Sequence, residues 1–287
     1  MQYSDTAFAK INLCLDVGGK LPDGYHRIRS IMQSLRFGDT VSVSFGGEGW
    51  SVQSNLPYLP TGDNNLAVRA ALLFSEVSHI HDGGTILIEK RIPVCGGFGG
   101  GSSDAAAVLR ILNRRHGSPL SWEELERFSE ALGADVPFCI RGGTCLATGK
   151  GECLAPLPDF APYPVVICRP DFSCSTPELF RAFDSLRLPL HPDVSGMETA
   201  LRRADLMGVS HRLFNVFEEV LQKKNAAQIA ELKNALLDAG ALGASMTGSG
   251  SGVFALFKTR KEAVSAAAAL RRQHIDAAVT ETGPRIT

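Results

Sequence analysis

Apolar and polar residues alternate through residues 7–17, near the start of the chain. In a strand, the apolar residues would lie on one face and the polar residues on the other. The apolar set is Ile11, Leu13, Leu15 and Val17, and the polar set is Lys10, Asn12 and Asp16. A period of two predicts a β-strand with one buried face. Asp23-Gly24 then predicts a turn into a second strand over about 26–35.

The following hundred residues mix strand and helix patterns. Apolar runs predict strands over 41–45 and 85–92, and spaced apolar positions predict a helix over 65–77. Ser121 and Glu124 form a capping-box pattern, which predicts a helix that ends at Gly133. We expect a strand-and-turn region from there to about residue 152.

A proline-rich segment, 155–164, is the best candidate for a linker. It divides the chain into a predicted N-terminal domain, 1–155, and a predicted C-terminal domain, 164–287. The second part predicts a strand over 165–168, a helix that begins at Thr176-Pro177, helices within 197–239, a helix over 261–273 and a last strand over 276–280. This mixture favours two α+β domains, the second with helices packed on an antiparallel sheet.

Composition narrows the class of protein. The chain has 287 residues, of which 44% are hydrophobic and 21% charged, as is typical of a soluble globular protein. A net charge of −1 gives no electrostatic reason to expect nucleic acid or an anionic membrane as a partner. No apolar run has the length of a membrane span, and no signal-peptide pattern opens the chain. The seven scattered cysteines form no C-x-x-C pair, which fits reduced thiols, so we expect a cytoplasmic protein.

Residues 93–105 form the most informative segment, Pro-Val-Cys-Gly-Gly-Phe-Gly-Gly-Gly-Ser-Ser-Asp-Ala, between a strand-like run and a helix-like run over 104–113. Its five glycines let the backbone approach a ligand, and the N-terminus of a following helix favours an anion such as phosphate. No lysine follows the glycines and the spacing is not G-x-G-x-x-G, which disfavours P-loop and dinucleotide folds. A flexible Gly/Ser linker is the alternative, but such a linker does not normally lead directly into an apolar helix.

Other candidate residues have ordinary explanations when each is taken alone. Lys10 and Asn12 share the polar face of the first strand, about 7 Å apart by the strand rise, where a solvent-facing role is ordinary. Asp135 lies between the helix end at Gly133 and an apolar run, so it is either a turn-capping residue or a chemical group.

Three further features are equally open. A second glycine cluster, 248–252, is either a tight turn or a space for a bound phosphate or substrate. Tyr25 and His26 follow the Asp-Gly turn and would ordinarily pack within a hairpin, and Phe180 on a helix would ordinarily be a core residue. The order of all these features along the chain therefore has to decide between the ordinary and the functional explanations.

That order resembles the GHMP kinase superfamily, the small-molecule kinases of galactose, homoserine and mevalonate. Residues 9–13 (Ala-Lys-Ile-Asn-Leu), 93–105 and 246–254 resemble its three motifs. Residues 23–26 (Asp-Gly-Tyr-His) and 133–137 (Gly-Ala-Asp-Val-Pro) are similar to one branch, which acts on a cytidine diphosphate-linked methylerythritol. The resemblance spans residues 9 to about 257, nearly the whole chain.

The middle motif departs from the superfamily pattern in two ways. Phe98 stands where leucine is usual, and an extra glycine and Asp104 interrupt its end. The resemblance nevertheless implies a two-domain α+β GHMP kinase fold. Its N-terminal domain would be ribosomal-S5-like, its C-terminal domain ferredoxin-like, and the active site would lie in the cleft between them.

The resemblance also implies roles for individual residues. Asp135 would be the base that takes the proton from the 2-hydroxyl of the substrate, and Lys10 would keep it ionised and offset phosphoryl charge. Tyr25 and Phe180 would sandwich the cytosine ring by stacking, with His26 at the base edge. The remaining contacts would be Asn12 and Thr176 to the substrate, Asn65 beside the adenine, and, around the ATP phosphates, Pro93, Val94, Cys95, Gly96, Gly97, Phe98, Gly99, Gly100, Gly101, Ser102 and Ser103.

The implied reaction is ATP-dependent phosphorylation of the 2-hydroxyl of that cytidyl substrate, in the non-mevalonate route to isoprenoids. ATP and Mg²⁺ are the implied cofactors, without an assigned magnesium ligand. No segment has the pattern of an obvious interface, so the oligomeric state stays open between a monomer and a homodimer. Two alternatives stay open, another GHMP kinase for homoserine or a mevalonate phosphate, and a nucleotide or sugar sensor without catalysis. The residues Tyr25, His26 and Phe180 argue against the first, and the presence of both Lys10 and Asp135 argues against the second.

Overall fold

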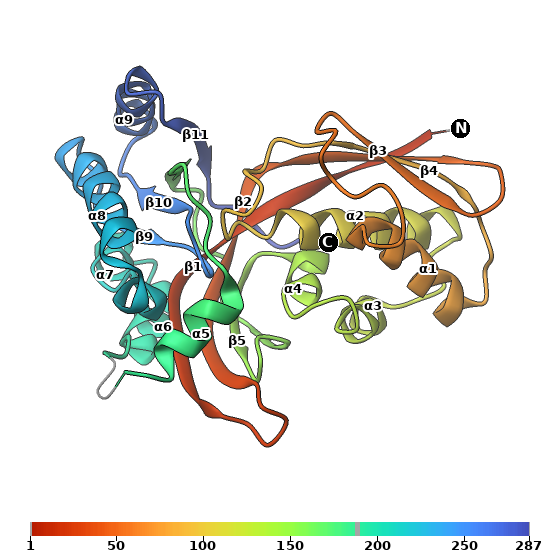
Figure 1. Cartoon of the computed structure of the whole chain (residues 1–287), viewed down its shortest axis with the longest axis horizontal. Coiled ribbons are helices and arrows are strands. Elements are labelled where there is room, and N and C mark those ends of the chain that lie inside the picture. The colour runs from red at the N-terminus through yellow and green to blue at the C-terminus, as the bar shows by residue number, and fades with distance from the viewer. Residues whose placement is uncertain (1, 187–189, 287) are drawn as a thin grey trace.

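The structure is a computed structural model that describes residues 2–186 and 190–286. It contains two sheets, and each sheet with its helices forms one half of the molecule. The long strands β1 and β2 run between the two halves (Figure 1). The strands are β1 (Gln2–Lys20), β2 (His26–Phe45), β3 (Trp50–Ser54), β4 (Gly84–Glu89), β5 (Thr144–Thr148), β6 (Cys153–Pro156), β7 (Pro164–Arg169), β8 (Phe214–Asn215), β9 (Gly243–Met246), β10 (Val253–Leu256) and β11 (Asp276–Glu281). The helices are α1 (Leu66–Ser78), α2 (Gly100–Arg115), α3 (Trp122–Ser129), α4 (Val136–Arg141), α5 (Thr176–Phe183), α6 (Val194–Arg202), α7 (Leu206–Ser210), the 3₁₀ helix η1 (Val216–Val220), α8 (Lys223–Asp238) and α9 (Arg260–Arg272).

The larger sheet has the strand order β3-β4-β2-β1-β8, and β5 and β6 extend it from β2. The alanine-rich faces of α1 and α2 form one core with apolar side chains of β2, β3 and β4. The strands predicted at 26–35 and 41–45 are one continuous strand, β2, because its pairing with β1 passes through Gly38. A side chain at Gly38 would lie 2.4 Å from the carbonyl oxygen of Ala7, so glycine permits this close approach.

The middle of β1 is buried on both faces, which corrects the prediction of one buried face. Lys10 and Asn12 are each 3% exposed, although they are polar. On the opposite face, Ile11 and Leu13 pack in a core to which both sheets contribute side chains. The register of β1 against β2 shifts between Phe8 and Lys10 and again after Asn12, and such bulges redirect side chains. The first strand therefore carries two polar side chains into the interior between the halves.

The smaller sheet has the order β11-β7-β10-β9 with antiparallel pairing throughout, as the sequence predicts for the second half. Apolar residues of α8 and α9 belong to the core of this half. The proline-rich segment 155–164 is packed, since Leu157 and Phe160 are buried and the Phe160 N–H donates to Thr144 Oγ1 at 3.2 Å. The division of the chain at this segment stays a prediction.

Two predicted boundaries were wrong near the glycine-rich segment. The helix expected from Asp104 begins at Gly100, so the last glycines and both serines form its first turn. The region after Gly133 begins with α4, with Pro137 in the first turn of that helix, and the expected strand follows only as β5. A short apolar run does not distinguish a buried helix from a buried strand by its pattern alone.

Within residues 2–186 and 190–286, none of the helices combines the length and apolarity needed to cross a bilayer.

Candidate active site

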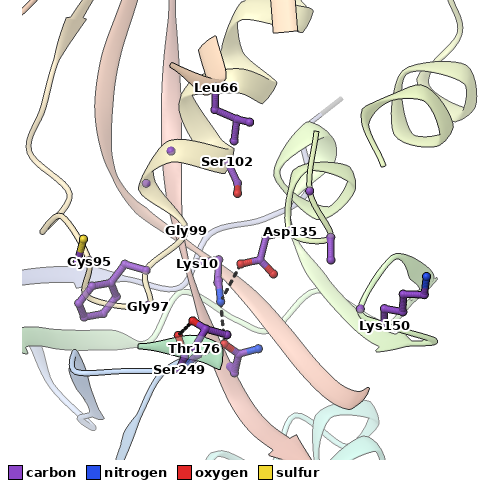
Figure 2. Close-up of a pocket in the computed structure, with 18 of the residues that line it drawn as sticks. Lys10, Leu66, Cys95, Gly97, Gly99, Ser102, Asp135, Lys150, Thr176 and Ser249 are labelled. Atoms are coloured by element: carbon purple, nitrogen blue, oxygen red, sulfur yellow. Dashed lines mark hydrogen bonds and ion pairs between the residues drawn. The ribbon is translucent and has the colours of Figure 1, made fainter. Parts of the chain in front are cut away.

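A cavity of about 1350 Å³ lies between the two halves, lined by β1, β2, the glycine-rich segment, α1, α5 and the N-terminus of α4. Figure 2 shows its centre, where Lys10 points toward Asp135 and the turn that carries Ser249 lies beside Thr176. The cavity brings together every predicted site residue except one. Ser103 is buried, and its hydroxyl donates to the carbonyl oxygen of Phe8 at 2.6 Å, so it supports the turn from behind.

The glycine-rich segment forms one wall of the cavity and ends in the first turn of α2. Gly97 and Gly99 adopt φ of 76° and 73°, which glycine reaches without strain. The first intrahelical bond runs from Ser103 N to Gly99 O at 2.8 Å, so the amides of residues 100–102 precede it. A helix N-terminus of this kind, with a positive dipole end, suits a polyphosphate.

The second glycine cluster, 248–252, packs directly against the first. The Gly252 N–H donates to Gly96 O at 3.0 Å. A Cβ on Gly97 would lie 2.1 Å from Thr247 O, and one on Gly252 would lie 2.2 Å from Gly96 O. The glycines of both clusters therefore allow two backbones to interlock, and Gly248 and Ser249 also reach the cavity.

Phe98 occupies the position where the superfamily motif usually has leucine. Its ring is buried at 1% exposure and packs in the core that joins the two halves. Its carbonyl oxygen accepts the Lys10 N–H at 3.0 Å. The ring and the carbonyl oxygen of Phe98 thus anchor the glycine-rich segment to β1 from the inside.

Lys10 and Asp135 form an ion pair at the centre of the cavity, with Lys10 Nζ 3.3 Å from Asp135 Oδ2. The Lys10 side chain is 4% exposed and that of Asp135 is 41% exposed, so the carboxylate is the member that a substrate can reach. Asp135 occupies the N-cap position of α4 but, in the described part of the chain, its side chain makes no capping bond. Its carboxylate is therefore directed to Lys10 and the cavity rather than to the helix.

The Asn12 side chain makes several hydrogen bonds to other described residues, and its contact with substrate stays a prediction. Its Oδ1 accepts Lys10 Nζ at 2.9 Å, the Gly248 N–H at 3.0 Å and Thr247 Oγ1 at 3.3 Å. Its Nδ2 donates to Ser30 Oγ at 2.8 Å. The amide thereby holds the Lys10 ammonium in place and links it to the second glycine cluster.

Tyr25, His26 and Phe180 line the same cavity, and the stacking of a cytosine ring between Tyr25 and Phe180 stays a prediction. Phe180 stacks on His26 with centroids 4.9 Å apart and 17° between planes. Tyr25 is 62% exposed, and Lys150 lies over its ring at 4.5 Å. His26 Nε2 is 2.6 Å from Asp184 Oδ1, and hydrogen bonds from Lys20 and His26 hold the pKa of the Asp184 carboxyl below its usual value.

Two further predicted contacts have local partners. Asn65 is the N-cap of α1, where Oδ1 accepts the Ala67 N–H at 2.9 Å and Nδ2 donates to Pro60 O at 2.7 Å. Thr176 Oγ1 donates to Ser249 Oγ at 2.7 Å, which joins the start of α5 to the second glycine cluster (Figure 2). Both residues still line the cavity.

Sequence reasoning missed several charged residues of this cavity, namely Lys20, Lys90, Asp104, Lys150 and Asp184. Asp104 had a visible signal, because it is an acid inside an otherwise apolar helical run. Lys150 had another, because it stands between two glycines. The ion pairs of these residues bring together segments far apart in the chain, so spacing alone did not reveal them.

Comparison with known proteins shows the class of protein to which this fold belongs. The GHMP kinases N terminal domain matches residues 65–143, and the GHMP kinases C terminal domain matches residues 197–276. Among solved structures, a homoserine kinase from Cytophaga hutchinsonii superposes with a TM-score of 0.76 at 21% identity, covering 99% of this chain and 95% of the other, which shows the shared fold. The chain therefore has the two-domain GHMP kinase fold that the sequence motifs predicted.

Proteins with higher sequence identity to this chain show the family within this class. A 4-diphosphocytidyl-2-C-methyl-D-erythritol kinase of Clostridium botulinum is 38% identical over 276 residues, 96% of this chain and 98% of that protein. One from Lachnoclostridium phytofermentans is 42% identical over 258 residues, 90% of this chain and 88% of that protein. A crystal structure of 4-(cytidine 5'-diphospho)-2C-methyl-D-erythritol kinase superposes with a TM-score of 0.83 at 33% identity, covering 98% of this chain and 99% of the other. This chain belongs to the 4-diphosphocytidyl-2-C-methyl-D-erythritol kinase family.

Proposed function

We propose that this protein transfers the γ-phosphoryl group of ATP to the 2-hydroxyl of 4-diphosphocytidyl-2-C-methyl-D-erythritol, giving the 2-phosphate and ADP. The observation that carries the proposal is the Lys10–Asp135 pair, 3.3 Å apart, in one cavity with the glycine-rich helix start and an aromatic group. Phosphoryl transfer to an alcohol requires these parts, a proton acceptor, a cation and a phosphate cradle.

Each residue of the pair has a distinct task in this reaction. Asp135 accepts the hydroxyl proton as the oxygen forms its bond to the γ-phosphorus and the bond to the bridging oxygen of ADP breaks. Lys10 pairs with the Asp135 carboxylate and offsets the negative charge on the transferring group. Asn12 holds Lys10 for both tasks through its 2.9 Å bond.

The cavity offers separate places for the two substrates. We assign the triphosphate to residues 93–99 and the first turn of α2, and the adenine to the part beside Asn65, since all of these line the cavity. The cytosine ring would enter among Tyr25, His26 and Phe180, where stacking gives affinity without dependence on charge. Because Phe180 rests on His26 in this structure, a base between Tyr25 and Phe180 requires the Phe180 ring to move from that stack.

Magnesium would accompany the nucleotide. Mg²⁺ retains several waters and is usually held by substrate phosphates with one or two carboxylates, so a dedicated protein cage is unnecessary. The described residues contain no group of three His, Cys, Asp or Glu side chains arranged to hold a metal, and a nucleotide-borne ion needs none. When bound, the ion would neutralise phosphate charge beside Lys10.

We also place the protein in the cytoplasm, acting as a monomer or homodimer on its small-molecule substrate without nucleic acid. All seven cysteines are free thiols, which supports a reducing compartment. The predicted domains, 1–155 and 164–287, would form the two walls of the cleft.

A coupled assay of ADP release tests the proposed reaction directly. Purified protein with ATP and Mg²⁺ is offered the cytidyl substrate, homoserine and mevalonate in parallel. We expect turnover with the cytidyl substrate alone. Turnover of homoserine or mevalonate with none of the cytidyl substrate would show that the substrate is wrong while the kinase class stands.

A further inference from the structure

A second lysine lies beside the nucleotide segment, in a cluster to which the proposed reaction gives no role. The Lys90 ammonium donates to a carboxylate oxygen of Asp39 and, at 2.7 Å, to Asp104 Oδ2. The three side chains are 4%, 0% and 7% exposed. Their formal charges are one positive and two negative, so the fully ionised cluster is buried with a net negative charge.

The cluster holds two walls of the cavity together. Asp39 Oδ1 accepts the backbone N–H groups of residues 91–92, where the chain leaves β4 for the glycine-rich segment. Asp104 lies one turn after Gly100 in α2, and a Cβ on Gly100 would lie 3.2 Å from Lys90 Nζ. Lys90 and Asp104 both line the cavity. The cluster therefore lies directly behind the turn that would receive the phosphates.

One atom of the cluster has no partner in the described part of the chain. Asp104 Oδ1 is buried without a hydrogen bond. Burial raises the pKa of the Asp104 carboxyl to about 8, the charge of Lys90 opposes this, and the charge of Asp39 adds to it. For Lys90, burial alone would lower the pKa, but the two carboxylates outweigh it and hold the pKa above its usual value. Asp104 is thus the member that exchanges a proton near neutral pH.

The elements packed around α2 bring few other charges to this group. Lys90 follows β4, and Asp39 belongs to β2. The remaining titratable side chains nearby pair with each other or are exposed, Lys10 on β1 with Asp135 at the start of α4, and Arg69 and Glu76 on α1.

We propose that the Lys90–Asp39–Asp104 cluster positions the phosphate-binding turn and that nucleotide binding draws a proton from solvent onto Asp104. The inference goes beyond the proposed reaction and rests only on its nucleotide site. An ionised Asp104 places uncompensated negative charge behind the first turn of α2, where it opposes the phosphates. A protonated Asp104 leaves the cluster neutral, so the N–H groups of the turn act on the phosphates without that opposition.

Calorimetry of ADP binding tests the inference without the second substrate. Wild type, Asp104→Asn and the control Asp238→Asn, which changes an exposed acid on α8, are titrated with ADP between about pH 7 and about pH 9. We expect the Kd of wild type and of the control to rise roughly fivefold over this range. The Kd of Asp104→Asn should stay constant, because its amide is neutral throughout.

Proton exchange gives a second readout that a purely structural role would not change. At about pH 8, titrations in two buffers of different ionisation enthalpy report the protons taken up per ADP bound. Wild type should take up a fraction of a proton more than Asp104→Asn. Equal Kd profiles and equal proton uptake in the two proteins would overturn the inference.

The wild-type measurement decides the question even if Asp104→Asn does not fold. A wild type that binds ADP at about pH 8 without proton uptake excludes coupling to Asp104. If ADP does not bind at any pH, the nucleotide site itself is wrong and the inference falls with it. Normal ADP binding and proton uptake without turnover of the cytidyl substrate would count against the proposed reaction alone.

Discussion

Two lysine–carboxylate clusters lie along the same glycine-rich segment and differ chiefly in burial. In the Lys10–Asp135 pair the carboxylate is 41% exposed and faces the cavity. In the Lys90 cluster both carboxylates are enclosed, at 0% and 7% exposure. A carboxylate that substrate can reach suits proton transfer, whereas an enclosed one with backbone partners suits positioning. The difference in burial therefore supports different roles for the two clusters, although both consist of a lysine and carboxylates.

The two clusters are also held differently. Lys10 is fixed by the side chain of Asn12, which in turn binds the second glycine cluster of the other half. Lys90 is fixed within the N-terminal half by Asp39 and Asp104. The proposed reacting pair thus depends on how the two halves meet, and the buried cluster depends on one half alone.

Replacing Lys10 should give the largest effect that separates the clusters. Lys10→Met removes a preorganised cation from the reacting centre, and we expect kcat to fall by about 10³-fold. The control Lys258→Met changes an exposed lysine and should keep kcat within about twofold. Steady-state assays with the cytidyl substrate measure both. Wild-type turnover in Lys10→Met would place the essential cation elsewhere.

Removing the Asn12 amide tests whether Lys10 needs its link to the other half. Asn12→Ala leaves Lys10 paired with Asp135 but without its hydrogen bond to Asn12 Oδ1, and we expect kcat to fall by about 10²-fold because small misplacements of a reacting group are costly. ADP affinity should change little. Ser42→Ala removes another buried polar group of the same sheet and serves as the control. A rise in substrate KM alone would instead indicate that Asn12 contacts substrate.

Shortening Phe180 should affect substrate binding and spare the chemistry. Loss of base stacking costs about 1–3 kcal/mol, so Phe180→Ala should raise the KM for the cytidyl substrate by roughly tenfold or more. Phe180→Tyr keeps a stacking ring and should retain most of the affinity. ADP binding should be unaffected in both variants. An unchanged KM in Phe180→Ala would exclude this ring from the base site.

Ser102 and Ser103 are adjacent, but Ser103 is buried and Ser102 lines the cavity. Their substitutions should have the smallest effects. Ser103→Ala should lower the free energy of unfolding by about 1 kcal/mol, because its buried bond to Phe8 O is lost. Ser102→Ala should leave stability unchanged and weaken ADP binding by a few-fold, roughly the worth of one hydrogen bond. Urea unfolding and calorimetry measure the two quantities. The opposite assignment of effects would show that Ser103 faces the ligand.

Local patterns in the sequence predicted much of the fold. The capping box at Ser121, the Asp-Gly turn and the final helix and strand lie where the sequence placed them. The start of α2 was placed too late, because glycines at 100–101 have low helix propensity and tertiary packing overrides it. The sequence did not predict α4, because a short apolar run has the same pattern in a buried helix as in a buried strand.

The candidate site was predictable where residues follow one another and less so where distant segments meet. The glycine-rich segment and the Asp-Gly-Tyr-His turn are contiguous, so their motifs are visible in the chain. The burial of Asn12 depends on Thr247 and Gly248, more than two hundred residues away in the sequence. The stack of His26 on Phe180 depends on the docking of α5. Such contacts follow from the packing of the two halves, which no short motif encodes.

The turnover of Asp135→Asn tests the central claim most directly. The amide keeps the size of the side chain but cannot accept the hydroxyl proton, so kcat should fall by about 10³-fold or more. Calorimetry on the same variant should give an ADP Kd within about twofold of wild type, because residue 135 lies outside the phosphate turn. Wild-type turnover by a folded Asp135→Asn protein would contradict the assignment of Asp135 as the base.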